Sequence, residues 1–190
     1  MGRPHDPLYR PARREEQVRA GALRTILAGV LAIASATGLQ SCTETSAADA
    51  ELLPAESAQV IAVVDGDTID VQTAGGEARV RLIGLDTPEI NRDGGQDDCY
   101  AQEARDELNT MVYGQAVELR ADPTQDDTDR YGRLLRHVYI DGQSAAVVLL
   151  EAGAAHEYTY DAPYIGQAEH RDAERAAQAD ALGMWGSCTG

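Results

Sequence analysis

The sequence predicts an α+β fold, a five-stranded OB-type β-barrel that carries three helices. Three observations support this prediction. Runs of β-branched residues bounded by turn residues indicate strands, and apolar residues at helical spacing indicate helices. These elements follow one another as three strands, a helix, two strands and two helices. At 190 residues with 43% hydrophobic residues, the chain has room for one such domain and a targeting segment.

Three strands begin the predicted domain, which we expect to span residues 58–190. The strands cover residues 60–64, 68–73 and 78–85. Asp65-Gly66-Asp67 separates the first two, and residues 74–77 separate the second from the third; both segments have turn composition. The three strands therefore form an antiparallel meander.

The first helix is predicted over residues 100–113, where Ala104, Leu108 and Val112 share one face and Gly114 provides a stop. The remaining elements are two strands and two helices. The strands cover residues 116–121 and 134–140, and the helices cover residues 144–151 and 165–182.

The first 42 residues resemble a bacterial export signal. Arg13, Arg14, Arg19 and Arg24 precede an uncharged, apolar stretch, which ends at Leu39-Gln40-Ser41-Cys42. This ending resembles the lipobox of lipoproteins, so we expect Cys42 to be acylated and to attach the chain to the outer face of the cell membrane. An uncleaved single-span anchor and a secreted form remain as alternatives. Residues 43–57 are small, polar and acidic, which predicts a flexible tether.

The two other cysteines, Cys99 and Cys188, form an even pair in a chain that we expect to be exported. An oxidising compartment favours a disulfide between them over a metal site, and no Cys-x-x-Cys spacing is present. Two buried free thiols are the alternative.

The charge of the chain argues against broad electrostatic binding of nucleic acid. Its formal net charge is −16, and all sixteen cationic side chains are Arg. A generic basic footprint is therefore missing. Any nucleic-acid function has to rest on particular residues.

Two carboxylates, Asp67 and Asp86, follow the ends of predicted strands and are expected to meet at one rim of the barrel. Two carboxylates, a backbone carbonyl and water suit Ca²⁺, and the sequence offers no Cys or His cluster for Zn²⁺. Alone, Asp-Gly-Asp is typical of an ordinary hairpin turn.

Arg81 and Arg133 lie on the same predicted framework, and Glu89 follows Asp86 by three residues. Two guanidinium groups can hold a phosphodiester and stabilise the charge of its transition state. A carboxylate within reach can act as the base for water. With a cation, these groups are the parts that hydrolysis of a phosphodiester needs.

These segments, in this order and spacing, resemble the staphylococcal-nuclease (thermonuclease) family over roughly residues 58–185. With the export signal, the chain resembles an exported bacterial member of that family. The resemblance implies an OB barrel with three helices. It also implies a Ca²⁺-dependent endonuclease, a phosphodiesterase that hydrolyses DNA and RNA with little base specificity and leaves 3′-phosphate ends. The implied roles are Ca²⁺ ligation by Asp67, Asp86 and the Thr87 carbonyl, and catalysis by Arg81, Arg133 and the general base Glu89.

By the same resemblance Tyr131, Tyr158 and Tyr160 line the nucleotide pocket, and Arg130 stands where the staphylococcal enzyme has Lys. Alternation over residues 157–160 also fits packing against the barrel. The three histidines after residue 100 have no ligand spacing and are expected to be surface or structural residues, and Trp185 is expected in the core.

Two other functions remain open. One is a non-catalytic OB-fold lipoprotein that binds nucleic acid or protein, as degenerate family members do, although those usually lack the Arg or Glu residues that this chain retains. The other is a structural lipoprotein with a stabilising Ca²⁺ site. For the nuclease we expect DNA and RNA as substrates and a monomer.

Overall fold

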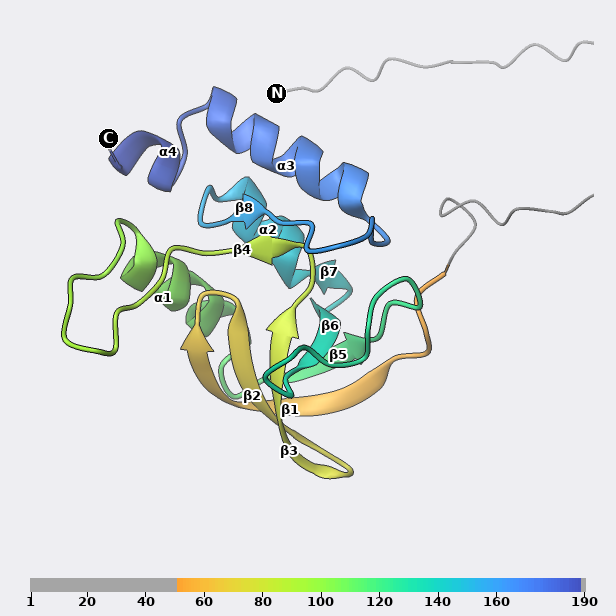
Figure 1. The fold of residues 1–190 in the computed structure, drawn as a ribbon. Coiled ribbons are helices and arrows are strands. Elements are labelled where there is room, and N and C mark those ends of the chain that lie inside the picture. Colours follow the sequence, from red (N-terminus) through yellow and green to blue (C-terminus); the bar gives the residue numbers. More distant parts are fainter. Residues whose placement is uncertain (1–50, 189–190) are drawn as a thin grey trace, which may run out of the picture. The chain divides into compact units, whose positions relative to one another are not determined.

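The computed structural model describes residues 51–188 (Figure 1). The predicted signal segment 1–42, with Cys42, and residues 43–50 of the predicted tether lie outside this range. Within the described range, none of the helices has the length and apolar character needed to cross a membrane.

Five strands form a closed barrel. They are β1 (Glu56–Asp65), β2 (Thr68–Thr73), β3 (Gly76–Leu82), β5 (Ala116–Arg120) and β6 (Leu134–Ile140). Neighbouring strands run antiparallel in the order β3-β2-β1-β5-β6, and a parallel pairing of β3 with β6 closes the barrel. The predicted five-stranded fold is confirmed, including the meander of its first three strands.

Strand β1 is the longest of the described strands and pairs with two neighbouring strands. Its first half pairs with β5, from Glu56 opposite Leu119, and its second half pairs with β2. Two register irregularities lie between Val60 and Asp65, and such bulges bend a strand. Strand β1 starts at Glu56, so the last two residues of the predicted tether belong to the barrel.

The core fills the barrel and continues under the helices. Alternate residues of β2 and β3 point inward, as the pleat of a strand requires. The largest fully buried side chains are Ile69, Leu82, Leu85, Leu108, Leu119, Leu149, Leu150, Val60, Val71, Val80, Val112 and Val138. They come from both strands and helices and form one continuous cluster.

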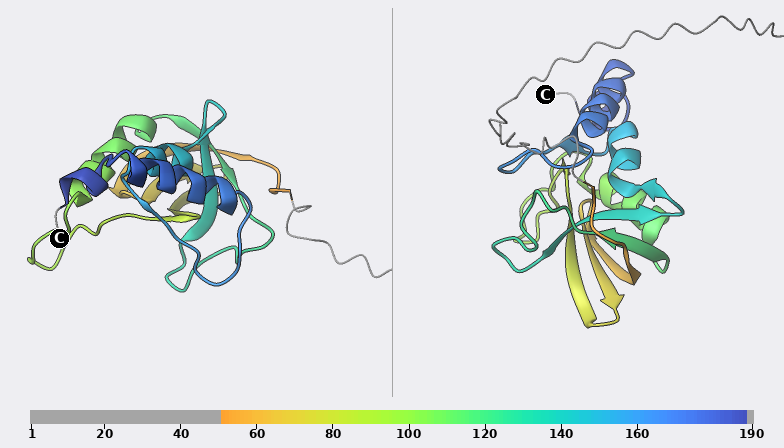
Figure 2. Two further views of the ribbon diagram at one scale, coloured as in Figure 1. Left: turned by 90° about the horizontal axis from the view of Figure 1, so that it is seen from above. Right: turned by 90° about the vertical axis from the view of Figure 1, so that its right-hand side faces the viewer.

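The three predicted helices are present as α1 (Ala101–Val112), α2 (Ala145–Glu151) and α3 (Gln167–Ala179). Helix α1 packs on β1, and α2 contacts both β6 and α3 (Figure 2). A single helical turn, α4 (Met184–Ser187), follows α3 and was not predicted. Trp185 lies in this turn and is only partly buried, so its predicted core position is wrong; Met184 is the buried residue there.

The predicted third strand, residues 78–85, continues past the point where the observed strand ends. Strand β3 ends at Leu82, because Gly84 has a φ of 86° and turns the chain. The next residues form β4 (Leu85–Asp86), which pairs with β8 (His156–Glu157) outside the barrel. A third short strand, β7 (Gln143–Ser144), extends β6.

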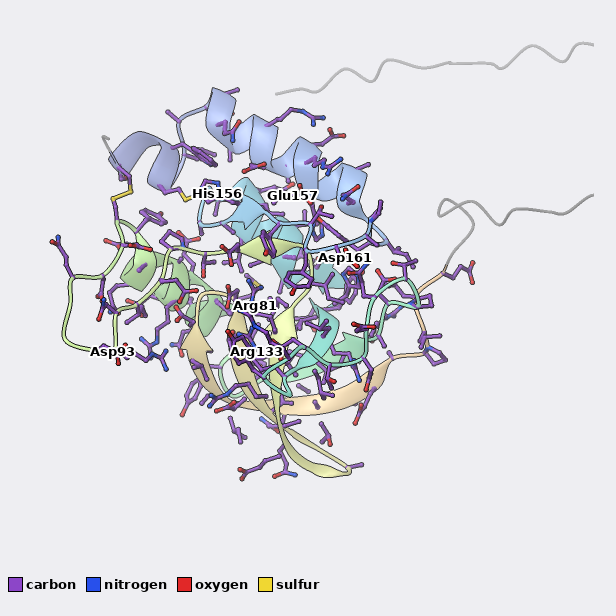
Figure 3. The ribbon with its side chains drawn as sticks, in the orientation of Figure 1. Arg81, Asp93, Arg133, His156, Glu157 and Asp161 are labelled. Atoms are coloured by element: carbon purple, nitrogen blue, oxygen red, sulfur yellow. A yellow bond between two sulfur atoms is a disulfide. The ribbon has the colours of Figure 1, made fainter. Side chains whose placement is uncertain are left out.

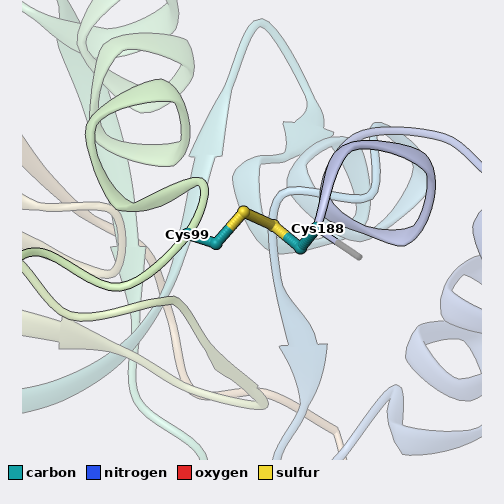
Figure 4. The surroundings of a disulfide bond; sticks show 2 residues. All are labelled: Cys99 and Cys188. Atoms are coloured by element: carbon teal, nitrogen blue, oxygen red, sulfur yellow. A yellow bond between two sulfur atoms is a disulfide. The ribbon is translucent and has the colours of Figure 1, made fainter. Parts of the chain in front are cut away.

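A disulfide joins Cys99 to Cys188, as predicted, with 5.8 Å between their Cα atoms (Figure 4). It connects Cys99, two residues before α1, to the residue after α4. The bond therefore ties the C-terminal turn to the segment that follows the Asp86–Glu89 region.

Candidate active site

The Asp65-Gly66-Asp67 turn lies directly against the chain that follows β4. A Cβ atom added to Gly66 would come within 2.8 Å of the Oγ1 atom of Thr87, whose side chain is buried. Only glycine permits this approach. The contact brings Asp67, at the end of one turn, next to Asp86, at the end of β4.

Arg81 connects these two carboxylates. Its Nη2 atom lies 2.9 Å from Oδ2 of Asp67 and 2.7 Å from Oδ1 of Asp86. Its Nη1 atom donates to the carbonyl oxygens of Leu82 and Leu85, both at 2.8 Å. The guanidinium is thus held by the turn at Gly84, which points it at the place where the two carboxylates meet.

Negative charge accumulates around this point. Burial raises the pKa of Glu89, and the nearby Asp67, Asp65 and Asp86 raise it further, while Arg81 lowers it. Burial also raises the pKa of Asp86, which Arg81 lowers and Asp67 raises. The pKa of Asp65 is raised by burial and by Asp67, against the opposing hydrogen bond from Gly66. Arg81, and Arg92 at 3.5 Å from Asp65, are outnumbered by these carboxylates.

A hard divalent cation fits this donor set. Carboxylate and carbonyl oxygens are the ligands that Ca²⁺ takes, and the mutual repulsion of the carboxylates is relieved by a positive ion. Over residues 51–188, no group of three or more His, Cys, Asp or Glu side chains suited to a metal ion is found. The expected ligand set of Asp67, Asp86 and the Thr87 carbonyl contains two such side chains.

Arg133 approaches the same region from the loop before β6. Its Nε atom donates to Oδ2 of Asp129 at 2.6 Å, and its Nη1 atom donates to the Thr68 hydroxyl at 3.4 Å. That hydroxyl donates to Oδ1 of Asp67 at 2.7 Å. Arg81, Asp67, Thr68 and Arg133 therefore form one polar chain, and the two Arg side chains lie close together in Figure 3.

A pocket of about 380 Å³ opens beside this chain. Its lining includes Asp67, Thr68, Glu89 and Arg133, together with Arg92 from the loop after Glu89. Glu89 is exposed as a residue although its carboxyl group is partly desolvated, and no hydrogen bond to its carboxylate is present among the described residues. A candidate base, a guanidinium and a candidate cation ligand thus face one solvent-accessible space.

The four predicted substrate-binding residues form two exposed pairs. The Nη2 atom of Arg130 donates to the Tyr131 hydroxyl at 2.7 Å, and its guanidinium lies 4.7 Å from the centre of the Tyr131 ring. The Arg133 guanidinium lies 5.5 Å from the same ring. The ring centres of Tyr158 and Tyr160 are 6.4 Å apart. Tyr131 is therefore next to the candidate site, and all three Tyr rings are open to solvent.

Two groups that shape the site were not predicted. Asp129 accepts hydrogen bonds from the backbone N–H groups of Tyr131 and Arg133 and from the Arg133 side chain. Its position four residues before Arg133 is a signal that the sequence contains. The other group is the Gly84 carbonyl, for which the sequence offers no signal.

The Gly84 carbonyl oxygen accepts hydrogen bonds from three distant residues. They are the Tyr158 backbone N–H at 3.3 Å, the Tyr164 hydroxyl at 3.1 Å and the His170 Nδ1 atom at 3.2 Å. His137 and His170 are both buried, which agrees with the predicted structural role. These contacts fix the turn that holds Arg81 and Asp86.

Comparison with known proteins places this architecture in a family. The model of the family described as "Staphylococcal nuclease homologue" matches residues 79–187. The chain is 35% identical over 125 residues to the endonuclease YncB of Bacillus subtilis (strain 168), covering 64% of this chain and 58% of that protein.

Two further relatives have similar identities. The chain is 34% identical over 125 residues to the SPbeta prophage-derived endonuclease YokF of Bacillus subtilis (strain 168), covering 64% of this chain but 41% of that protein. It is 33% identical over 127 residues to the thermonuclease of Staphylococcus hyicus, covering 67% of this chain and 74% of that protein. The matched parts span about half the length of the two Bacillus relatives and about three quarters of the thermonuclease. From the match over residues 79–187 and from these identities, the chain belongs to the family of staphylococcal nuclease homologues.

Proposed function

We propose that this chain is a Ca²⁺-dependent endonuclease that hydrolyses phosphodiester bonds of DNA and RNA with little base specificity and leaves 3′-phosphate ends. The observation that carries the proposal is the polar chain Arg81–Asp67–Thr68–Arg133 beside a pocket that Glu89 also lines. Two guanidinium groups and a carboxylate base around one open space suit a phosphodiester and a water molecule.

The two Arg residues have different freedom to bind phosphate. Both Nη atoms of Arg81 are already engaged, by carbonyl and carboxylate oxygens. Arg133 is held through Nε by Asp129, and its Nη atoms make only the long contact to Thr68. Arg133 therefore offers N–H groups to a phosphate in a fixed orientation. Such preorganised donors stabilise the charge that develops in the transition state.

Glu89 serves as the base in this proposal. Its carboxylate takes a proton from water as the water oxygen bonds to phosphorus, and the bond from phosphorus to O5′ breaks, leaving the phosphate on the 3′ side. The departing O5′ takes up a proton from solvent and becomes a hydroxyl group. Burial and the neighbouring carboxylates raise the pKa of Glu89, which makes it a stronger base than an ordinary Glu. A Ca²⁺ ion held by Asp67, Asp86 and the Thr87 carbonyl would neutralise phosphate charge.

Low base specificity follows from the kind of contact that the exposed Tyr rings and Arg side chains can make with a nucleic acid. Tyr131, Tyr158 and Tyr160 present exposed rings, and aromatic stacking tolerates every base. Arg130 and Arg133 beside Tyr131 offer charge to the backbone, which carries no sequence information.

The proposal includes an extracellular location and a monomer. The Cys99–Cys188 disulfide supports an oxidising compartment. Attachment to the membrane through acylated Cys42, or release as a secreted protein, is tested by mass spectrometry and detergent partitioning of the cellular protein. A mature chain that retains residues 1–42 would contradict both forms.

The central experiment is digestion of plasmid DNA and of RNA with Ca²⁺ or with EDTA, followed by labelling of the product ends. Glu89→Gln and Arg133→Ala should each lower kcat by about 10²- to 10³-fold, as loss of a base or of a transition-state donor does. Arg120→Ala is the matched control, because Arg120 pairs with Glu118 on β5, away from both pockets. Binding of nucleic acid with Ca²⁺ but without cleavage would instead support a non-catalytic module.

A further inference from the structure

The backbone at Glu89 is held by a single residue, Asp98. The Glu89 N–H donates to Oδ2 of Asp98 at 3.1 Å, and the Asp98 N–H donates to the Glu89 carbonyl at 3.0 Å. These two hydrogen bonds close the loop of residues 89–98, and we call the Glu89–Asp98 pair the neck of this loop. The position of the Glu89 side chain depends on this neck.

The loop itself is held by exposed hydrogen bonds and by one ion pair, in which Nη2 of Arg92 lies 3.5 Å from Oδ2 of Asp65. The Asn91 N–H donates to Oδ1 of Asp97 at 2.8 Å, and Oδ1 of Asn91 accepts from the N–H groups of Asp93 and Gly95. Water competes for bonds of this kind, so each contributes little to keeping a loop closed. No strand or helix lies between residues 89 and 98.

The residue that follows the neck in the chain forms a covalent bond. Cys99 is the residue after Asp98, and its disulfide leads to Cys188 at the end of α4 (Figure 4). The Asp98 side of the neck is therefore attached covalently to the C-terminal turn.

The C-terminal turn is in turn fixed to the side of the site that carries Asp86. The Met184 N–H donates to the Gly153 carbonyl at 2.9 Å, and the Trp185 ring meets the His156 ring edge-on, with 4.7 Å between centres. His156 pairs with Asp86 in the β4–β8 ladder. One short turn thus contacts the strand that pairs with β4, which carries a candidate metal ligand, and is joined through the disulfide to the neck beneath the candidate base.

A second pocket, of about 430 Å³, lies at this junction. Its lining includes Asp86, Glu89, Asp98, Trp185 and both disulfide cysteines. Asp86 and Glu89 therefore border one space on the side of the disulfide, and Glu89 also borders the pocket on the side of Arg133.

We propose that Asp98 and the Cys99–Cys188 disulfide position Glu89 relative to Asp86, so that the α4 turn acts as a clamp on the site. Asp98 is a positioning residue, because it touches the Glu89 backbone and not the reacting groups. The inference rests on the proposed role of Glu89 as the base. Misplacement of a catalytic group lowers the rate of the chemical step far more than it lowers substrate binding.

The test compares the purified chain with the double variant Cys99→Ser/Cys188→Ser and with Asp98→Ala and Asp98→Asn. The double variant and Asp98→Ala should lower kcat about tenfold or more, with KM within about twofold, because the base and not the binding surface is displaced. Asp98→Asn keeps an oxygen that can accept from Glu89 N–H and should restore most of the rate. Leu119→Ala, in the core at β5, controls for loss of stability and should keep kcat while folded.

Amide hydrogen exchange gives a readout that does not depend on activity. The Glu89 and Asp98 amides should exchange at least about tenfold faster in the double variant and in Asp98→Ala, while the amides of β2 keep their protection. Unchanged exchange at these two amides, or a wild-type kcat in the folded variants, would overturn the positioning role. A parent chain that cleaves neither DNA nor RNA would instead refute the proposed nuclease, and the exchange result would still test the clamp. If the double variant does not fold, the two Asp98 variants decide.

Discussion

Gly66 packs against Thr87 so closely that a Cβ atom at residue 66 would meet three atoms of the Thr87 side chain at 2.8–2.9 Å. We expect Gly66→Ala to push the Asp67 turn away from Asp86 and to destabilise the fold by about 1–3 kcal/mol, as other overpacked sites do. Ca²⁺ binding, measured by calorimetry, should weaken together with kcat.

Gly75→Ala is the matched control for this change. Gly75 is also a glycine in a hairpin turn, but a Cβ atom there would come only within 3.5 Å of Oγ1 of Thr73, an ordinary contact. Ca²⁺ affinity equal to the parent in both variants would show that the Gly66–Thr87 contact does not place the carboxylates.

The turn that holds Arg81 should be equally sensitive at Gly84. This residue has a φ of 86°, and a Cβ atom would lie 2.5 Å from the Tyr164 ring and 2.6 Å from Nδ1 of His170. Gly84→Ala therefore adds a steric clash to the backbone strain of about 1–2 kcal/mol that a left-handed residue carries.

Gly142→Ala is a control that separates the steric clash from the backbone strain. Gly142 has a φ of 81° and open space around a Cβ atom, so this variant should show the strain alone. Urea unfolding of the two variants should differ by about 1–3 kcal/mol, with Gly84→Ala the less stable. Equal losses would mean that the Tyr164 and His170 contacts do not hold the turn.

Acid stability should depend on Asp122, whose side chain is buried. Burial raises the pKa of Asp122, but hydrogen bonds from His137, from Thr124 and from the Ile165 N–H outweigh it and lower the pKa from 3.8 to about 2. A carboxyl with a lowered pKa stabilises the fold fully above its unfolded value and loses this contribution as the pH falls through the folded value.

The expected contribution of Asp122 is about 2 kcal/mol at neutral pH, lost between about pH 4 and pH 2. Urea unfolding across this range measures it. In Asp122→Asn the free energy of unfolding should be lower at pH 7 and should fall less steeply over the same window. A parallel pH dependence in both proteins would assign the acid sensitivity to other carboxyls.

Salt should inhibit the proposed nuclease activity less than it inhibits binding by basic nucleic-acid-binding proteins. After Cys42 the chain contains ten Arg against 29 Asp and Glu, a formal charge of −19. Proteins that make 6–10 phosphate contacts lose about 10³- to 10⁵-fold in affinity between 50 and 200 mM salt. Here repulsion between the acidic surface and the substrate is screened over the same range, which offsets part of that loss.

Steady-state kinetics on DNA across this range measures the effect. We expect KM to rise by less than about tenfold, with Arg130→Ala lowering the salt slope by about one if Arg130 contacts a phosphate. A slope as steep as that of a strongly basic protein would show that acidic residues far from the site do not influence binding.

Local patterns in the sequence determined much of this protein. The strands and helices were predictable because period-two and helical spacings report directly on which side of an element is buried. The candidate site residues were proposed from the sequence as a constellation of three short segments, and in the structure Arg81 lies within hydrogen-bonding distance of both Asp67 and Asp86. The net charge, in contrast, gave no indication of the family to which the chain belongs.

The tertiary structure decided what depends on contacts between distant residues. The turn at Gly84 that ends the third strand is held by Tyr158, Tyr164 and His170, more than 70 residues away, which contact the Gly84 carbonyl. Trp185 sits against His156 and not in the core because the disulfide and Gly153 place α4 there. Spacing along the chain reports on the face of one element, whereas these positions depend on which elements meet, and only the folded barrel brings them together.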